Sequence, residues 1–249
     1  MFPKIEIYGH HIGMFPLYVG IGLVSGVFLI FIQLKKMQSS LEEENRVMIA
    51  IPFCFLSGVA GGFLLDILLR GGINALFTNP LGFGLTFYGW LLTAILFLIF
   101  YAKCRKMSGL FLLNLFLPSF AIAQAFGRIG CFLGGCCYGR PAKLWGVSYP
   151  AGSLPYLHHG AVALHPVQLY ESFYLTVVFI ILFTLIRFKY RGAVYLILAA
   201  LGRFFFEFLR NDDRGTLFFD VLSPSQWISC VLFAAGWIVL LKAQKEHVS

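Results

Sequence analysis

The sequence predicts an all-α fold, a polytopic membrane protein with seven transmembrane helices. Hydrophobic residues make up 59% of the 249 residues, charged residues make up only 12%, and the mean hydropathy is +0.82. Soluble globular domains do not have this composition. In addition, the chain contains seven apolar segments, each near the roughly 20 residues that a helix needs to cross about 30 Å of hydrocarbon.

The expected spans follow one another with short polar loops between them. Backbone groups in lipid must be hydrogen-bonded internally, and the even alternation of a barrel strand is missing, so each span is expected to be a helix. The first span lacks a basic leader and a cleavage site, so we expect it to be retained. Without internal repeats or low-complexity tracts, residues 1–249 are treated as one integral membrane domain. The spans are expected near residues 14–34, 47–69, 83–101, 109–133, 165–187, 192–210 and 222–242.

Lysine and arginine are unequally divided between the two sets of loops. The loops at 34–47, 101–109 and 187–192 and the C-terminal tail hold 11 of them, whereas the opposite set holds 6. The positive-inside rule then predicts an external, periplasmic N-terminus and a cytoplasmic C-terminus. The connection 137–164, between the fourth and fifth spans, is therefore expected on the non-cytoplasmic side. The same distribution accounts for the net charge of +8 without a nucleic-acid partner.

The fourth span ends in a segment that places an arginine at membrane depth. Residues 110–141 read LFLLNLFLPSFAIAQAFGRIGCFLGGCCYGRP, with Arg128 among several glycines. A charge in this position is costly unless a partner or a ligand uses it. Glycines let a backbone approach a ligand closely, and they also let helices pack closely in lipid. We infer that this part of the chain binds an anion.

Three cysteines lie in the same segment. Cys136 and Cys137 are adjacent, and Cys131 lies five residues before Cys136. This is not the CxxC spacing of a zinc site and no histidine pair lies nearby, so we expect no metal and no cofactor. Small polar packing is the expected role of the three residues. A disulfide outside the cytoplasm, or a nucleophilic thiol activated by Arg128, are the alternatives.

The sixth span contains GRFFFEFLR. Arg203 and Glu207 are four residues apart and therefore share one face of the helix, and Arg210 lies a further turn along. The pair alone would neutralise itself, but Arg128 on another helix adds positive charge. We therefore predict that Glu207 orients Arg203, whose planar guanidinium then holds a phosphate through two hydrogen bonds.

The fifth span begins with a polar stripe in HPVQLYE. His165, Gln168 and Glu171 follow each other at intervals of three residues and share one helix face. A polar stripe within a span should face the bundle interior or a wet cavity, where a structural network and a substrate site would both use it. Tyr18 and Tyr88 lie near span starts, where an interfacial aromatic belt is the default interpretation.

The motifs occur in the order GRIGCFLGG, YGRP, WGVSYP, HPVQLYE, GRFFFEFLR and LSPSQWIS. With these motifs and seven spans, the chain resembles the bacterial prolipoprotein diacylglyceryl transferases over nearly its whole length. The resemblance implies transfer of the sn-1,2-diacylglyceryl group of phosphatidylglycerol to the lipobox cysteine thiol of a preprolipoprotein. A thioether forms and glycerol phosphate leaves. The resemblance also implies the bacterial cytoplasmic (inner) membrane as the location, and membrane lipids and signal peptides with a lipobox cysteine as partners.

The resemblance and the polar patterns together define the candidate site. The two arginines at membrane depth would stabilise the charge on the phosphate. The acceptor thiol needs a base, and the residues do not choose among His165, Glu171, Glu207 and Tyr88, although a tyrosine is better suited to donate a hydrogen bond to the lipid. The predicted catalytic residues are Arg128, Arg203, Glu207, Tyr88 and His165. The predicted substrate-binding residues are Arg128, Arg203, Tyr18, Gly139, Gln168, Tyr170, Glu171 and Arg210, with Cys131, Cys136 and Cys137 as reactive or packing cysteines.

Three polar positions depart from the family pattern. Its signature commonly has Asn and Glu where this chain has Cys131 and Cys136, and a histidine is common at the position of Tyr88. One alternative is a paralogous membrane transferase that uses the same lipid donor with another acceptor, with a cysteine as a covalent way-station. The other alternative is a small anion or lipid transporter with a path lined by the two buried arginines. The lack of duplicated halves argues against transport.

Overall fold

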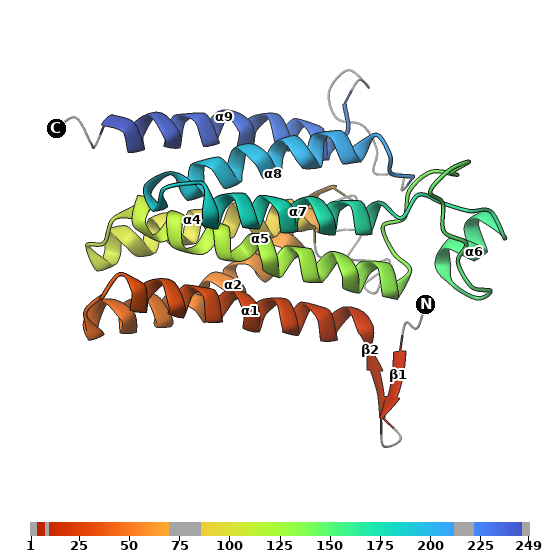
Figure 1. The fold of residues 1–249 in the computed structure, drawn as a ribbon, viewed down its shortest axis with the longest axis horizontal. Helices are drawn as coiled ribbons and strands as arrows, with labels where there is room; N and C mark the ends of the chain where they lie inside the picture. Colours follow the sequence, from red (N-terminus) through yellow and green to blue (C-terminus); the bar gives the residue numbers. More distant parts are fainter. Residues whose placement is uncertain (1–3, 8–9, 70–85, 212–221, 246–249) are drawn as a thin grey trace. The chain divides into compact units, whose positions relative to one another are not determined.

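The computed structural model describes residues 4–7, 10–69, 86–211 and 222–245, which are mainly helical (Figure 1). They belong to two compact units. One consists of Met1–Ile30 with Asn114–Ser249, and the other of Phe31–Leu113. The single integral membrane domain that the sequence predicts stays a prediction.

The elements follow the apolar segments of the sequence, with a small hairpin before the first helix. In that hairpin, two four-residue strands pair antiparallel with Lys4 opposite Gly13, an addition to the all-α expectation. The elements are β1 (Lys4–Ile7), β2 (His10–Gly13), α1 (Met14–Lys36), α2 (Leu41–Leu69), α4 (Phe87–Arg105), α5 (Gly109–Gly134), α6 (Leu154–His159), α7 (Val167–Thr184), the 3₁₀ turn η1 (Phe188–Tyr190), α8 (Arg191–Glu207) and α9 (Pro224–Lys245).

Six helices of the described residues are long and apolar enough to cross a membrane, namely α1, α2, α4, α5, α7 and α9. They match six of the predicted spans. The predicted span 192–210 corresponds to α8, which has 17 residues, so the seventh crossing stays a prediction. Helix α2 begins earlier than the predicted span because its first turn carries three glutamates, which hydropathy excludes but which stabilise a helix N-terminus through the helix dipole.

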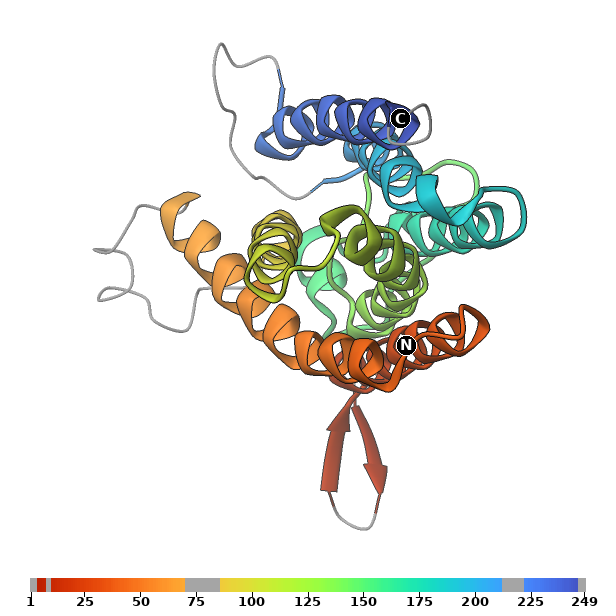
Figure 2. The same ribbon diagram turned by 90° about the vertical axis from the view of Figure 1, so that its left-hand side faces the viewer.

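The larger unit is a set of neighbouring helices in which α8 packs against both α7 and α9 (Figure 1 and Figure 2). Hydrogen bonds join this group to α5. The Ser172 hydroxyl donates to the carbonyl of Ala125 at 3.0 Å, and the Tyr195 hydroxyl donates to Gln124 Oε1 at 3.0 Å. Such bonds hold helices together in lipid, where the hydrophobic effect does not.

A buried asparagine fixes the end of this unit where α5 and α8 begin. Asn114 is 3% exposed. Its Nδ2 donates to the carbonyl of Lys189 at 2.9 Å, and its Oδ1 accepts from the backbone N–H of Gly192 at 2.7 Å. The side chain thus satisfies a backbone N–H that the start of α8 leaves without a helical partner, and it sets α8 in register with α5.

In the smaller unit, α2 packs against α4. Thr93 Oγ1 donates to the carbonyl of Ser57 at 2.9 Å, and the ring of Trp90 lies against Gly58. Tyr88 is buried in α4, and Asp66 is buried in α2. Arg70 follows Asp66 by four residues in the sequence and would be its partner on a helix face, but it lies outside the described residues.

Replacing Gly202 with alanine should destabilise the packing of α7 on α8. A Cβ at this position would overlap the ring of Tyr174, with Cδ1 only 2.8 Å away. Overpacking of this kind costs about 1–3 kcal/mol, and we expect a lower midpoint of thermal unfolding in detergent. Gly20→Ala is the matched control because a Cβ there meets nothing within 4 Å. An unfolding midpoint for Gly202→Ala at or above that of the control would contradict this account.

A buried arginine–glutamate cluster forms the candidate active site

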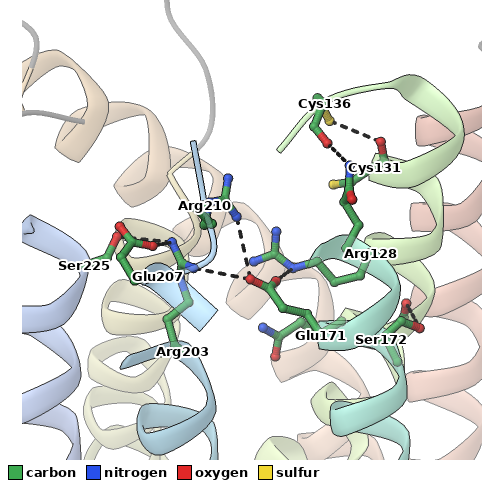
Figure 3. Close-up of polar contacts among 12 residues, drawn as sticks. Arg128, Cys131, Cys136, Glu171, Ser172, Arg203, Glu207, Arg210 and Ser225 are labelled. Carbon is green, nitrogen blue, oxygen red and sulfur yellow. Dashed lines mark hydrogen bonds and ion pairs between the residues drawn. The ribbon is translucent and has the colours of Figure 1, made fainter. Parts of the chain in front are cut away.

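Five charged side chains from three separate segments meet in the larger unit. Arg128 lies on α5, Glu171 on α7, Arg203 and Glu207 on α8, and Arg210 just after α8 (Figure 3). All five are nearly inaccessible to solvent, with side-chain exposures between 3% and 10%. Charges buried to this extent must be paired, because an isolated buried ion is very costly.

Glu171 is the centre of the cluster. Its Oε2 pairs with Nε of Arg128, and its Oε1 lies 3.3 Å from Nη1 of Arg203 and 3.6 Å from Nη1 of Arg210 (Figure 3). A single carboxylate therefore contacts three guanidinium groups. The sequence predicts Glu171 as a substrate-binding residue within a polar stripe. The structure gives it a more central position, since it joins α5, α7 and the end of α8.

The predicted pairing of Arg203 with Glu207 is confirmed as a contact. Nη2 of Arg203 lies 2.5 Å from Oε2 of Glu207, one helical turn further along α8. Nη1 of the same guanidinium reaches Glu171 on the neighbouring helix. The two ends of the planar group thus contact two different carboxylates, which fixes its plane.

Two serines at the start of α9 complete this arrangement. Nη2 of Arg203 donates to the Ser225 hydroxyl at 3.3 Å, and the Ser223 hydroxyl donates to Oε1 of Glu207 at 2.9 Å. Neither serine was among the site residues predicted from the sequence. Their signal was the polar run SPSQ at the beginning of an apolar helix, within the LSPSQWIS motif.

Short backbone connections bring the helix ends together at the cluster. The N–H of Gly139 donates to the carbonyl of His165 at 2.9 Å, and the N–H of Arg140 donates to the carbonyl of Leu209 at 2.9 Å. The segment after α5 is thereby fastened to the start of α7 and to the end of α8. A Cβ on Gly139 would lie 2.5 Å from Cγ2 of Val167, so glycine is required here for close backbone packing.

Gln168 fastens the turn that follows α5. It is 1% exposed, and its Nε2 donates to the carbonyl of Cys136 at 2.6 Å and to the Tyr149 hydroxyl at 3.3 Å. Burial raises the pKa of Tyr149, so this phenol stays neutral. The predicted polar stripe of α7 therefore faces the interior, and Gln168 has a structural role beside the charged cluster.

The sulfur atoms of the three cysteines of the glycine-rich segment lie within 4.8 Å of one another, and Cys131 and Cys136 lie near Arg128 (Figure 3). Hydrogen bonds from the thiols of Cys131 and Cys136 lower the pKa of Cys137 well below its ordinary value. A hydrogen bond with Cys131 acts to lower the pKa of Cys136, but the hydrogen bond with Cys137 and burial outweigh it and raise that pKa to about 11.

The remaining residues predicted for the site are His165, Tyr170, Tyr18 and Tyr88. Nδ1 of His165 is 3.3 Å from the Tyr170 hydroxyl, which donates to the carbonyl of Trp145 at 3.2 Å. Tyr18 is half-buried on α1, where its Cβ would lie 3.0 Å from a Cβ on Gly130. Tyr88 belongs to the other unit, and its role stays a prediction.

The described part of the cluster is rich in guanidinium groups. Among the described residues, Arg128, Arg203 and Arg210 meet at Glu171, and Arg203 also pairs with Glu207, in a region that is nearly closed to solvent. Arginine binds phosphate through a planar pair of N–H donors. The convergence of three guanidinium groups on one carboxylate therefore suits an anionic group such as a phosphate.

Nearly the whole chain is similar to proteins of one known family. Residues 4–242 match the family model described as prolipoprotein diacylglyceryl transferase. The chain is 34% identical to a phosphatidylglycerol–prolipoprotein diacylglyceryl transferase of Clostridium tetani, over 94% of each chain. It is 32% identical to phosphatidylglycerol–prolipoprotein diacylglyceryl transferase 2 of Clostridium perfringens, over 97% of this chain and 96% of the relative. Because the family model and these relatives cover nearly the whole chain, the chain belongs to the prolipoprotein diacylglyceryl transferase family.

Proposed function

We propose that this chain transfers the sn-1,2-diacylglyceryl group of phosphatidylglycerol to the lipobox cysteine thiol of preprolipoproteins. Family membership and the names of the relatives support this reaction. The observation that carries the proposal is the buried convergence of Arg128, Arg203 and Arg210 on Glu171. Guanidinium groups gathered in this way suit the negatively charged phosphate of phosphatidylglycerol.

The membrane arrangement that we propose has seven crossings, with α8 as the sixth. Its 17 residues are at the lower limit for a transmembrane helix. With the basic loops in the cytoplasm, the N-terminus lies outside and the C-terminus inside, in the bacterial inner membrane. The end of α5, the start of α7 and the 137–164 connection then lie on the outer side, and the cluster meets its lipid in the outer leaflet.

The guanidinium groups supply the charge stabilisation that the reaction requires. The acceptor thiolate attacks the glyceryl C3 carbon, the C–S bond forms, and the bond from C3 to the phosphate oxygen breaks. Glycerol phosphate leaves with the electron pair and an additional negative charge. Arg128 and Arg203 are fixed in advance by Glu171, and preorganised donors in a water-poor site stabilise developing charge strongly. Gly139, Gln168 and Tyr170 shape the surrounding wall.

The acceptor thiol must lose its proton, since an ordinary cysteine has a pKa near 8.5. Both glutamates of the cluster pair with arginines, so we expect them to position the guanidinium groups and not to take the proton from the acceptor thiol. His165 and Tyr88 remain candidate bases.

The experiment is a transfer assay with purified protein, phosphatidylglycerol vesicles labelled in the acyl chains, and a lipobox peptide. We expect the peptide to gain the mass of one diacylglyceryl group, and a peptide with serine at the lipobox position to gain none. If the peptide stays unmodified while fluorescent phosphatidylglycerol exchanges between leaflets, the protein is a lipid transporter and the proposal is wrong.

Glu207→Gln should reduce transfer by roughly 10- to 100-fold while the protein still inserts. The substitution removes the charge that holds Nη2 of Arg203 but keeps the size of the side chain. Because Arg203 and Glu207 act as a unit, Arg203→Ala combined with Glu207→Gln should cost far less than the sum of the single effects. Glu43→Gln, at an exposed position in the first turn of α2, is the control. Additive losses would show that the two residues act independently.

A further inference from the structure

The three cysteines that follow Arg128 form a compact group of sulfur atoms. The Sγ atoms of Cys131, Cys136 and Cys137 all lie within 4.8 Å of one another. In the part of the chain that the structure describes, this is the one group of three or more His, Cys, Asp or Glu side chains with metal-binding proximity. The sequence spacing argued against a metal, because the ligands of zinc sites commonly come in CxxC pairs. In the folded chain, however, the turn after α5 brings the three sulfur atoms together without a CxxC spacing.

The turn holds the sulfur atoms in place. Helix α5 ends at Gly134, and the N–H of Cys136 donates back to the carbonyl of Cys131 at 3.1 Å. Gly135 and Cys137 both have positive φ, at +72° and +60°. A residue with a side chain pays about 1–2 kcal/mol for this conformation, so the surrounding contacts must impose it on Cys137. One of these contacts is the hydrogen bond from Gln168 to the carbonyl of Cys136.

Neither packing nor a disulfide uses this arrangement fully. A disulfide would join two sulfur atoms and leave the third aside. Three thiolates that converge on one point suit a soft divalent cation such as Zn²⁺, and a zinc site with three protein ligands keeps its fourth position open. Zn²⁺ with three thiolates has a net charge of −1. Arg128 and Arg210 both interact electrostatically with Cys137, and their charges favour such an anion.

We propose that Cys131, Cys136 and Cys137 bind Zn²⁺ and that the open fourth position takes the thiol of the acceptor cysteine. The second part rests on the proposed function. The acceptor thiol displaces water, its proton goes to solvent, and the metal-bound thiolate attacks glyceryl C3 as the C–O bond to the phosphate breaks. Coordination deprotonates a thiol outright, so this site supplies the thiolate where the family's common histidine is replaced by Tyr88.

The binding test uses the full chain in detergent, reduced and stripped of metal under nitrogen. Titration with Co²⁺ should give a sulfur-to-cobalt charge-transfer band that saturates at one equivalent, and Zn²⁺ should abolish it. Replacing any one of the three cysteines with serine should weaken metal binding by at least about 100-fold (Cys131→Ser, Cys136→Ser or Cys137→Ser). Changing a residue that only hydrogen-bonds to a metal ligand weakens binding by about 10- to 100-fold. The combined change of Cys54, Cys104 and Cys230 to serine is the matched control and should keep the band.

Two outcomes of the titration would exclude the site. If the reduced protein gives no charge-transfer band, or if the band survives replacement of all three clustered cysteines, the proposed metal site is wrong. With Co²⁺ bound, a lipobox peptide should shift the band to that of a fourth sulfur ligand, and the serine peptide should not. An equal response to both peptides would overturn the role of the fourth position.

Transfer measurements separate this proposal from the proposed function. We expect the metal-free protein to transfer at least about tenfold more slowly than the zinc-loaded protein. If Co²⁺ binds as expected but the metal-free protein transfers at the full rate, the activating role is wrong and the proposed function stands. If Co²⁺ binds but no transfer occurs at any metal content, the proposed function and the activating role of the metal are both wrong. The metal site itself is then still supported by the binding measurements.

Discussion

Replacing Glu171 with glutamine should reduce diacylglyceryl transfer by at least about 100-fold, which corresponds to about 2.7 kcal/mol in the activation free energy. Glutamine keeps the shape of the side chain but removes the charge that Arg128, Arg203 and Arg210 share. Among the described residues, Glu207 is then the one carboxylate that pairs with this group of arginines. Leaving buried charges without their partner costs about 3–5 kcal/mol, and the guanidinium groups should separate.

The measurement is the initial rate of transfer to a lipobox peptide, with thermal unfolding recorded on the same preparations. Glu42→Gln is the control, because Glu42 also pairs with an arginine but its side chain is 75% exposed. An exposed ion pair contributes at most about 1 kcal/mol, so this variant should transfer at the wild-type rate. If Glu171→Gln keeps more than about a third of the activity, the cluster does not depend on its central carboxylate.

Arg203→Lys should also reduce transfer by about 100-fold, although it keeps the charge. The guanidinium of Arg203 reaches Glu171 through Nη1, and it reaches Glu207 and Ser225 through Nη2. A lysine ammonium is a compact group on a flexible stem and cannot span these partners while it also holds a phosphate. The loss of transfer activity should therefore result from the different geometry of the lysine side chain, since its charge is the same as that of arginine.

Helix α8 offers a matched control for this substitution in Arg191, at its other end. Nε of Arg191 donates to the carbonyl of Ile186 and its Nη2 to that of Phe183, each at 3.2 Å. Arg191→Lys should lower the unfolding temperature slightly and leave the transfer rate within about twofold of wild type. Equal losses for the two lysine variants would mean that arginine supports the helix and not the phosphate site.

The helices could be predicted from the sequence because lipid leaves few alternatives for an apolar segment of about 20 residues. Their ends were harder to predict, since residues such as Glu42 and Lys36 belong to helices that hydropathy truncates. The hairpin of β1 and β2 was missed because two four-residue strands carry little periodic signal. The hairpin is held together by hydrogen bonds between its two strands, and the amino-acid composition of a segment does not predict such pairing.

Part of the candidate site was also evident in the sequence. The spacing of Arg203 and Glu207 predicts their contact, because residues four apart face each other on a helix. The position of Glu171 among three arginines was not predictable, since it depends on which helices are neighbours. The proximity of Cys131 to Cys137 likewise depends on the positive φ angles of the turn, and residue spacing alone does not reveal them.

The start of α9 has a consequence for the biosynthesis of the protein. All five charged groups of the cluster have been synthesised once residue 210 is made, but Ser223 and Ser225, which hold Glu207 and Arg203, come later in the chain. A nascent chain that has not yet inserted α9 carries the charges without these contacts. We therefore expect the site to reach its final geometry only after the last helix has been inserted.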